Sequence, residues 1–436
     1  MCGNFAICSS NKNLNITGDL YLGTFYLQHR GQSYCGLSVF DGNSIKLHTH
    51  KGLVRDNFFS NLSGISGYMG IGHTSLKDRQ PLKLDSKMGE FTVCFSGNIV
   101  NRDELVAELK QRGHSFYTDS DIEILAKLIA MGDDFVDGIE KMAGKIRGSY
   151  SLVLLSKGKI YAARDKHGFR PLIIGSKEGC VAVASESCAF ANLGINIVRD
   201  VKPGEIIEIK DGKFETKKII HSDLIQYCAF EWIYTANVAS VIDGTPVDCA
   251  RKNIGALLAR RYPVHADIVA AVPNSGIGHA IGCSQESKIP FDNVFIKYDY
   301  ASRSYTQPTQ EERDREAKIK LIPVACKIKD RRVIICDDSI VRGTQFKNDL
   351  VVKLRNNGVK KIHARIACPP LKAPCLYGVA TRSKKELVAA EKTVEEIRQY
   401  IEVDTLAYAT IEDVSLAIGK PVEQLCTSCW TDVYKV

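Results

Sequence analysis

The sequence contains no apolar run long enough to cross a lipid bilayer, and its polar N-terminus lacks the profile of a secretory signal. We therefore expect a cytoplasmic protein with no membrane partner. The net charge is +8, but lysine and arginine are scattered rather than gathered on one stripe. This distribution argues against a nucleic-acid partner and favours a polyanionic small molecule. The sequence also lacks internal repeats and low-complexity segments.

The chain has 15 cysteines but no sign of secretion, so a disulfide framework is not expected. The cysteines are then free thiols, catalytic residues or metal ligands. A hydrophobic content of 44% is that of a globular protein, and 436 residues are too many for one ordinary core. We expect two or three domains.

Two patterns divide the chain into residues 1–226 and 227–436. The first half is predicted as α+β, with strands at 149–155, 160–164, 172–175, 181–185 and 206–209. Two helices are expected there, each opened by a capping box, Asn101 with Glu104 and Ser120 with Glu123.

The second half alternates between strands and helices. A helix is predicted at 247–261, and strands are predicted at 268–272, at 294–297 and from Val333 onward. Such alternation predicts a mostly parallel sheet that is covered on both faces.

The most informative segment is VIICDDSIVRGTQ in the second half. An apolar strand delivers Asp337 and Asp338 at its carboxyl end, and a turn around Arg342, Gly343 and Thr344 then opens a helix. Free N–H groups at the start of a helix favour a phosphate. The carboxylates would repel that phosphate but can accept hydrogen bonds from sugar hydroxyls, so the combination suits a ribose 5-phosphate. The alternative is a buried strand that ends in a solvated acidic turn.

Cys2 follows only Met1. Removal of Met1 would leave a cysteine whose α-amino group has an ordinary pKa of roughly 7.7 to 8.0, so one residue would supply both nucleophile and base. Taken alone, a cysteine at position 2 is usually incidental.

The segments CGNFAI, YLQHRGQSYCGLSVF, MGIGHT, RDKHGFRPLIIG, SESCAF and RDVKPGE succeed one another in the order seen in class II glutamine amidotransferases. The segment with the acid pair is similar to the ribose-phosphate signature of type I phosphoribosyltransferases. Nearly the whole chain thus resembles the glutamine phosphoribosylpyrophosphate amidotransferase family, in its iron–sulfur branch.

The resemblance implies an N-terminal nucleophile hydrolase domain with four αββα layers at residues 1–226. An α/β phosphoribosyltransferase domain with a mostly parallel sheet would follow at 227–436. The first domain would release ammonia from glutamine. The second would use that ammonia to make 5-phosphoribosylamine from phosphoribosyl pyrophosphate, which opens de novo purine synthesis.

For the glutamine site, the resemblance implies that Cys2 is the nucleophile, that Gly97 donates to the oxyanion and that Asp121 holds the substrate ammonium. Two positions depart from the family. Ser75 stands where the family has the arginine that pairs with the α-carboxylate of glutamine, and Ser96 stands where it has the oxyanion asparagine.

Three interpretations of this site stay open. Lys77 or Arg79 could replace the lost arginine in an intact glutaminase. The domain could instead be a weak glutaminase that works mainly on free ammonia, or it could have other chemistry.

For the donor site, the resemblance implies that Mg²⁺ arrives bound to the substrate. The residues implied are Ser275, Asp337 and Asp338 for Mg²⁺ and ribose, Arg342, Gly343 and Thr344 for the phosphate, and Arg303 and Lys320 for the departing pyrophosphate. Arg303 and Lys320 belong to a charged segment that is similar to the flexible loop of the family. Asn274, in VPNSG, replaces the usual aspartate.

Cys426 and Cys429 form a CxxC pair, which alone could be a redox motif, half a zinc site or chance. Together with Cys228 and Cys375 they match the four ligands of the [4Fe–4S] cluster in the iron–sulfur branch. Four thiolates can equally hold zinc, so only the resemblance selects iron. The cluster would be structural and would clamp the seam between the domains.

The main hypothesis is therefore a glutamine-dependent amidophosphoribosyltransferase. One rival is a paralogue in specialised metabolism that joins ammonia or another amine to the donor. Another is a non-catalytic sensor of phosphoribosyl pyrophosphate. The family also implies homo-oligomers, dimers or tetramers, with purine nucleotides as inhibitors.

Overall fold

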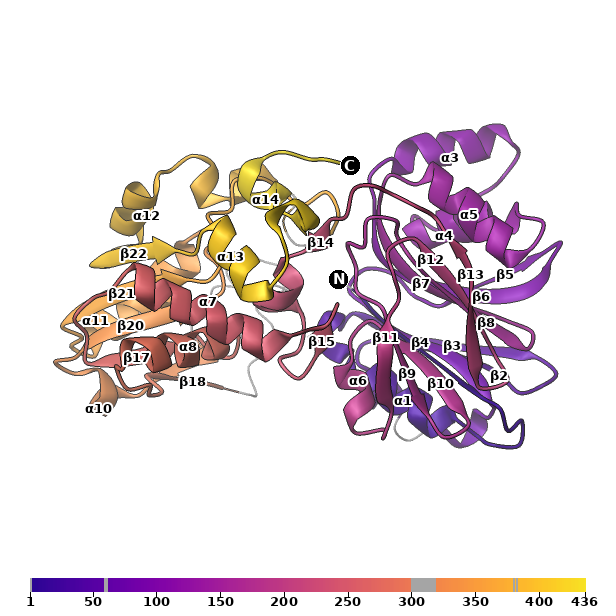
Figure 1. The fold of residues 1–436 in the computed structure, drawn as a ribbon, viewed down its shortest axis with the longest axis horizontal. Helices are drawn as coiled ribbons and strands as arrows, with labels where there is room; N and C mark the ends of the chain where they lie inside the picture. Colours follow the sequence, from indigo (N-terminus) through magenta and orange to yellow (C-terminus); the bar gives the residue numbers. More distant parts are fainter. Residues whose placement is uncertain (1, 59–61, 299–318, 379–380, 382) are drawn as a thin grey trace.

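The computed structural model describes residues 2–58, 62–298, 319–378, 381 and 383–436. The chain forms two lobes, one drawn from indigo to magenta and the other from rose to yellow (Figure 1). The N-terminal end of the chain lies where the two lobes meet.

The first lobe contains two antiparallel sheets. The seven-stranded sheet has the order β11-β9-β10-β1-β4-β2-β3, and the six-stranded sheet has the order β13-β12-β8-β7-β6-β5. The strands of the first sheet are β1 (Gly3–Ser9), β2 (Tyr34–Phe40), β3 (Ile45–Lys51), β4 (Met69–Ser75), β9 (Ile173–Lys177), β10 (Cys180–Ala184) and β11 (Asn196–Asp200). Those of the second are β5 (Leu82–Ser86), β6 (Gly89–Ile99), β7 (Gly148–Ser156), β8 (Lys159–Arg164), β12 (Glu205–Lys210) and β13 (Lys213–Ile219).

Alternation along the strands explains why the two sheets stack. In β1, Phe5 and Ile7 pack under a helix, whereas Ala6 and Cys8 point into a core shared with the other sheet. Successive side chains of a strand point to opposite faces, so a strand that is apolar on both faces must be covered on both. The small residues Ala6 and Cys8 fit the space between the sheets.

Helices cover the outer faces of both sheets. The seven-stranded sheet is covered by α1 (Thr17–Tyr26) and α6 (Cys188–Ala191), with α2 (Val54–Phe58) beside α1. The other sheet is covered by α3 (Arg102–Gln111), α4 (Asp121–Ala130) and α5 (Phe135–Lys145). The result is the four-layer αββα arrangement.

The second lobe is built on a parallel sheet with the order β17-β20-β21-β22. The strands are β17 (Ile268–Ala271), β20 (Arg332–Asp337), β21 (Lys361–Ile366) and β22 (Thr405–Tyr408). Its helices are α7 (Val247–Arg261), α8 (Ile277–Ser287), α10 (Ala325–Ile328), α11 (Val352–Asn356), α12 (Val394–Ile401), α13 (Ile411–Ile418) and α14 (Ser428–Thr431). Two π-helical segments, Glu231–Thr235 and Phe346–Val351, complete it. In the described parts of the chain, no helix is both long enough and apolar enough to span a bilayer.

Three short ribbons flank this sheet. They pair β14 (Tyr227–Cys228) with β23 (Leu425–Cys426), β15 (Val241–Ile242) with β16 (Thr245–Pro246), and β18 (Phe295–Lys297) with β19 (Leu321–Pro323). The strand predicted at 294–297 therefore exists, but as β18 it pairs antiparallel with β19 instead of joining the parallel sheet. The expectation that it belongs to that sheet was wrong.

Both predicted capping boxes were also wrong, although the helices begin where expected. The amide of Asn101 donates to the carbonyl oxygen of Lys145 (2.9 Å) and accepts from the backbone N–H of Arg147 (2.9 Å). Ser120 caps nothing with its side chain, and Glu123 instead accepts from the backbone N–H groups before its helix. Asn101 and Glu123, which the local pattern assigned to helix capping, form hydrogen bonds elsewhere in the folded chain.

The close packing of α7 on α8 gives a stability prediction. A Cβ atom on Gly255 would lie 1.8 Å from the carbonyl oxygen of His279, whereas one on Gly144 of α5 would meet nothing within 4 Å. We expect Gly255→Ala to force the two helices apart and to destabilise by about 1–3 kcal/mol. Gly144→Ala is the matched control and should gain up to about 1 kcal/mol from helix propensity. Thermal melts of both variants check this, and equal melting temperatures would contradict it.

Candidate functional site

Cys2 lies where the ends of the two sheets of the first lobe meet. Its sulfur is 3.7 Å from Oγ of Ser75, the last residue of β4, and its backbone nitrogen donates to Oγ of Ser96 in β6 (3.2 Å). Both serines are 1% exposed. The two positions that depart from the family pattern are therefore the two hydroxyls that touch Cys2.

Gly97 follows Ser96 and lies against β7. A Cβ atom at this position would be 1.9 Å from the carbonyl oxygen of Ser149, so a larger residue would push the two strands apart. This contact explains why glycine stands at position 97.

Asp121, the predicted ammonium acceptor, begins α4 and already has a cationic partner. Nε of Arg102 donates to its Oδ1 at 3.1 Å, and Arg102 also contacts Asp103 and Asp119. Burial raises the pKa of Asp121, although the positive charges of Lys77 and Arg102 work in the opposite direction. The described structure thus presents an ion pair here rather than a lone carboxylate.

The two cations considered as replacements for the lost arginine have different surroundings. Lys77 is close enough to lower the pKa of Asp121, whereas Arg79 lies over the ring of Tyr34, 6.0 Å from its centroid. Lys77 and Arg102 are therefore the cations that act on this end of the site.

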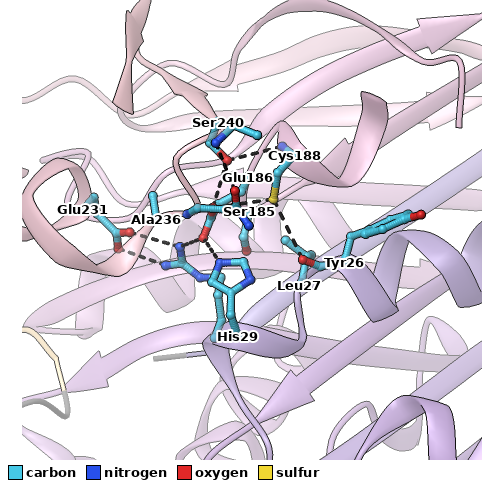
Figure 2. A network of polar contacts seen from close by, with 12 residues as sticks. Tyr26, Leu27, His29, Ser185, Glu186, Cys188, Glu231, Ala236 and Ser240 are labelled. Atoms are coloured by element: carbon cyan, nitrogen blue, oxygen red, sulfur yellow. Dashed lines mark hydrogen bonds and ion pairs between the residues drawn. The ribbon is translucent and has the colours of Figure 1, made fainter. Parts of the chain in front are cut away.

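A buried guanidinium joins Cys2 to the second lobe. Nε of Arg30 donates to the carbonyl oxygen of Cys2 (3.0 Å), and its two terminal nitrogens form ion pairs with Glu186 and with Glu231 (2.9 Å to the latter). In Figure 2, Glu231 lies to the left of Glu186, and His29 lies below Glu186. Because Glu231 belongs to the second lobe, the side chain of Arg30 both binds Cys2 and connects the two lobes.

Glu186 is the acceptor at the centre of this network. Besides Arg30 it contacts His29 (2.8 Å), the backbone N–H of Asn237 (2.7 Å) and the hydroxyl of Ser240 (2.9 Å). Burial alone would raise its pKa, but the charges and hydrogen bonds of His29 and Arg30 lower it to about 2 from the usual 4.5.

The donor-site residues meet at the carboxyl edge of the parallel sheet. Asp337 ends β20, and the hydroxyl of Ser275, in the loop after β17, lies 3.5 Å from its Oδ1. Burial and the adjacent Asp338 raise the pKa of Asp337 well above its usual value, whereas Lys320 lowers it. A group placed here that carries positive charge would therefore stabilise the ionised acid pair.

The remaining predicted donor-site residues are less closely gathered. Arg342 forms an ion pair with Glu386, and Gly343 has the positive φ of 74° that a left-handed turn requires. Thr344 follows in the first helical turn. Arg303 and most of the charged segment around it lie outside the described residues, whereas Lys320 is close enough to Asp337 to act on its pKa.

The four cysteines proposed as cluster ligands, called here the cysteine cluster (Cys228, Cys375, Cys426 and Cys429), converge at the seam. Cys228 and Cys426 are opposite one another in the parallel pair β14–β23, and Cys429 interacts electrostatically with the other three. Burial raises the pKa of Cys228 to about 12 and that of Cys429 well above its usual value. Buried thiols of this kind ionise readily only when a metal takes the charge.

The spacing of these thiols bears on which metal group they fit. In the described part of the chain, only His29, Glu186 and Cys188 bring three ligand atoms within 4.8 Å of one another, so the cysteine cluster is more open than that. Four sulfurs on one tetrahedral zinc ion would be about 3.8 Å apart, given a Zn–S bond of about 2.3 Å. The four thiols are therefore not gathered as closely as a single zinc ion would hold them. The His29 group, in contrast, already holds the cation Arg30.

Comparisons with known proteins match both halves of the chain. Residues 70–192 match a family model described as a glutamine amidotransferase domain. An amidophosphoribosyltransferase from Methanocaldococcus jannaschii is 38% identical over 463 aligned residues, which cover 100% of this chain and 97% of the relative. The amidophosphoribosyltransferase of Bacillus subtilis is 35% identical, with 99% of this chain and 94% of the relative covered.

Solved structures give the same result. The glutamine phosphoribosylpyrophosphate amidotransferase from B. subtilis, complexed with ADP and GMP, matches with a TM-score of 0.93 at 35% identity, covering 100% of this chain and 97% of that one. A structure described as the allosteric regulatory enzyme of purine biosynthesis matches with a TM-score of 0.92 at 34% identity, covering 100% and 96%. The predicted fold class is confirmed.

Sequence reasoning assigned no role to Arg30, Glu186, Glu231 or Arg102. Arg30 and Glu186 lie inside YLQHRGQSYCGLSVF and SESCAF, segments that carry the resemblance to the glutamine amidotransferases. A charged residue within a run that becomes buried is a signal of pairing, but the partner lies up to 201 positions away and cannot be read from the run itself.

The depressed pKa of Glu186 predicts a loss of stability in acid. Its pKa is lowered from 4.5 to about 2 on folding, so its contribution is complete above about pH 4.5 and disappears as the pH falls toward 2. The shift corresponds to about 3 kcal/mol. We expect wild type to be more resistant to urea than Glu186→Gln at pH 6, with the gap narrowing by pH 3. A gap independent of pH would contradict this.

Proposed function

The chain belongs to the amidophosphoribosyltransferase family, and we propose that it makes 5-phosphoribosylamine from phosphoribosyl pyrophosphate and ammonia released from glutamine. The observation that carries this proposal is the full-length match to the family, which covers 100% of this chain and therefore both lobes.

Ammonia release begins at Cys2. With Met1 removed, the α-amino nitrogen takes the thiol proton, and the sulfur attacks the side-chain carbonyl carbon of glutamine. A C–S bond forms, the C–N bond breaks, and ammonia leaves with the proton from the α-ammonium. Water then cleaves the thioester to glutamate. Ser96 accepts a hydrogen bond from the nitrogen of residue 2 and so fixes the base beside its thiol.

At the second site, ammonia displaces pyrophosphate from C1 of the ribose. Asp337 and Asp338 accept hydrogen bonds from the ribose hydroxyls, and the backbone of the turn at 342–344 receives the 5-phosphate. Ser275 and Asp337 lie where they could contact Mg²⁺, which would neutralise the pyrophosphate as it departs.

We also propose that the protein is a cytoplasmic homo-oligomer inhibited by purine nucleotides. Free thiols at all fifteen cysteine positions support a reducing compartment. Crystallisation of the B. subtilis relative with ADP and GMP supports nucleotide binding.

Nitrogen-source dependence tests the two half-reactions separately. We expect Cys2→Ala to lose phosphoribosylamine formation with glutamine but to keep it with ammonium salts, because only the first needs the nucleophile. Asp337→Asn should lose both by at least about 100-fold, since it removes charge that acts in the transition state. Cys249→Ala, an exposed thiol, is the matched control and should keep both.

Equal activity of wild type and Cys2→Ala with glutamine would refute the glutaminase part. Activity with ammonium alone in wild type would favour the ammonia-dependent rival, which the ion pair on Asp121 and the neutral Ser75 make the natural second candidate. Binding of phosphoribosyl pyrophosphate without pyrophosphate release would favour the sensor.

We propose that the cysteine cluster holds a structural [4Fe–4S] group. The proposal is supported by the electrostatic interaction of Cys429 with the other three thiols and by sulfurs that are not gathered as closely as one zinc ion would hold them. Anaerobically purified protein should contain about four iron and four sulfide per chain with broad visible absorbance, and Cys426→Ser should lose both and melt at lower temperature. Cys326→Ser, an exposed thiol, should lose neither. One zinc per chain without sulfide would overturn the assignment.

A further inference from the structure

Ser75 is the side chain that contacts the sulfur of Cys2. Its Oγ lies 3.7 Å from Sγ, and it is 1% exposed, so water does not compete for the contact. Backbone N–H groups of Lys77 and Asp78 also reach the same oxygen, at 3.1 and 3.0 Å. Three potential donors therefore surround one hydroxyl oxygen.

The valence of a hydroxyl decides how these contacts can coexist. A serine oxygen has two lone pairs and one proton to donate. The N–H groups of Lys77 and Asp78 are fixed by the turn after β4 and can act only as donors, so they fill both lone pairs. The only hydrogen-bonding capacity left to Ser75 is its own proton, and the remaining neighbour is the sulfur.

We propose that Ser75 is a catalytic residue of the glutaminase half, whose hydroxyl donates to the Cys2 sulfur and holds it as the thiolate. This inference rests on the proposed function. The proton of the thiol passes to the α-amino nitrogen, the Ser75 hydroxyl turns its hydrogen onto the sulfur, and no further reactant is consumed. While the thiol is protonated, its S–H is a third donor competing for filled lone pairs, so the contact favours the ionised sulfur.

Ser75 and Ser96 then contact different atoms of Cys2 and have different roles. Ser96 accepts from the nitrogen that serves as base. The hydroxyl of Ser75 lies 3.7 Å from the sulfur and donates to it once the thiol has ionised. Ser75 touches the nucleophile and carries no charge for a substrate carboxylate. Its removal should therefore lower kcat for glutamine hydrolysis more than it raises KM, whereas a substrate-binding role would raise KM.

Alkylation of Cys2 by iodoacetamide tests the inference without turnover. The tryptic peptide of residues 2–12 is followed by mass spectrometry between pH 5.5 and 9, and buried Cys8 in the same peptide is an internal reference. We expect Ser75→Ala to slow labelling of Cys2 by about 10-fold at pH 7 and to move the profile to higher pH, since a hydrogen bond to a charged group is lost. Ser38→Ala, another buried serine of the same sheet, should behave as wild type.

An isosteric pair makes the test independent of packing. Ser75→Thr keeps the hydroxyl and Ser75→Val replaces it with a methyl group at equal volume, so Thr should label faster than Val. Equal labelling rates and profiles in wild type and Ser75→Ala, or in the Thr and Val variants, would overturn the inference. Glutamine hydrolysis by wild type that does not need Cys2 would instead overturn the proposed function, which separates the two failures.

Discussion

The buried guanidinium of Arg30 is the interaction on which the rest of the structure depends. It is 3% exposed, and it binds the carbonyl oxygen of Cys2, Glu186 of the first lobe and Glu231 of the second. A charge buried this deeply is tolerated only while its partners stay in place, because removing one leaves the others desolvated and unpaired. The position of the nucleophile is thus tied to the docking of the two lobes, and neither can shift alone.

The carboxylate of Glu231 also connects this network of buried charges to the cysteine cluster. Glu231 also pairs with Arg170 (3.1 Å), whose other end donates to the carbonyl oxygen of Tyr377 (2.6 Å) and interacts with Cys228 and Cys375. A continuous line of buried charges therefore runs from the thiols at the seam to Cys2. Arg170 is accommodated beside the sulfurs because the carboxylate of Glu231 and the carbonyl oxygen of Tyr377 both bind it.

Hydrophobic periodicity and turn residues predicted the helices and strands that a single segment of the chain determines. The helix at 247–261 has the predicted bounds, and the strands β7, β8, β10 and β12 lie within a residue or two of expectation, because the apolar pattern that predicts each of them lies within its own segment. Contacts between distant segments were not predictable in this way. The sheet membership of β18, the use of Asn101 away from its helix end and the Arg102–Asp121 pair all depend on which segments fold against each other, and no pattern within one segment carries that information.

The two sites differ in how much change their electrostatics allow. At the donor site, two adjacent acids are buried together, and this raises the pKa of Asp337. Each further charge placed nearby therefore changes the ionisation of the pair. At the glutamine site, Asp121 is balanced by Arg102, and hydroxyls rather than charges contact the sulfur and the nitrogen of Cys2. The α-ammonium and α-carboxylate of glutamine bring one charge of each sign, and Asp121 and Arg102 present one charge of each sign to them. The serine at position 75, where the family has arginine, therefore leaves no buried charge unpaired. What restricts the choice of residue at this position is its contact with the sulfur of Cys2.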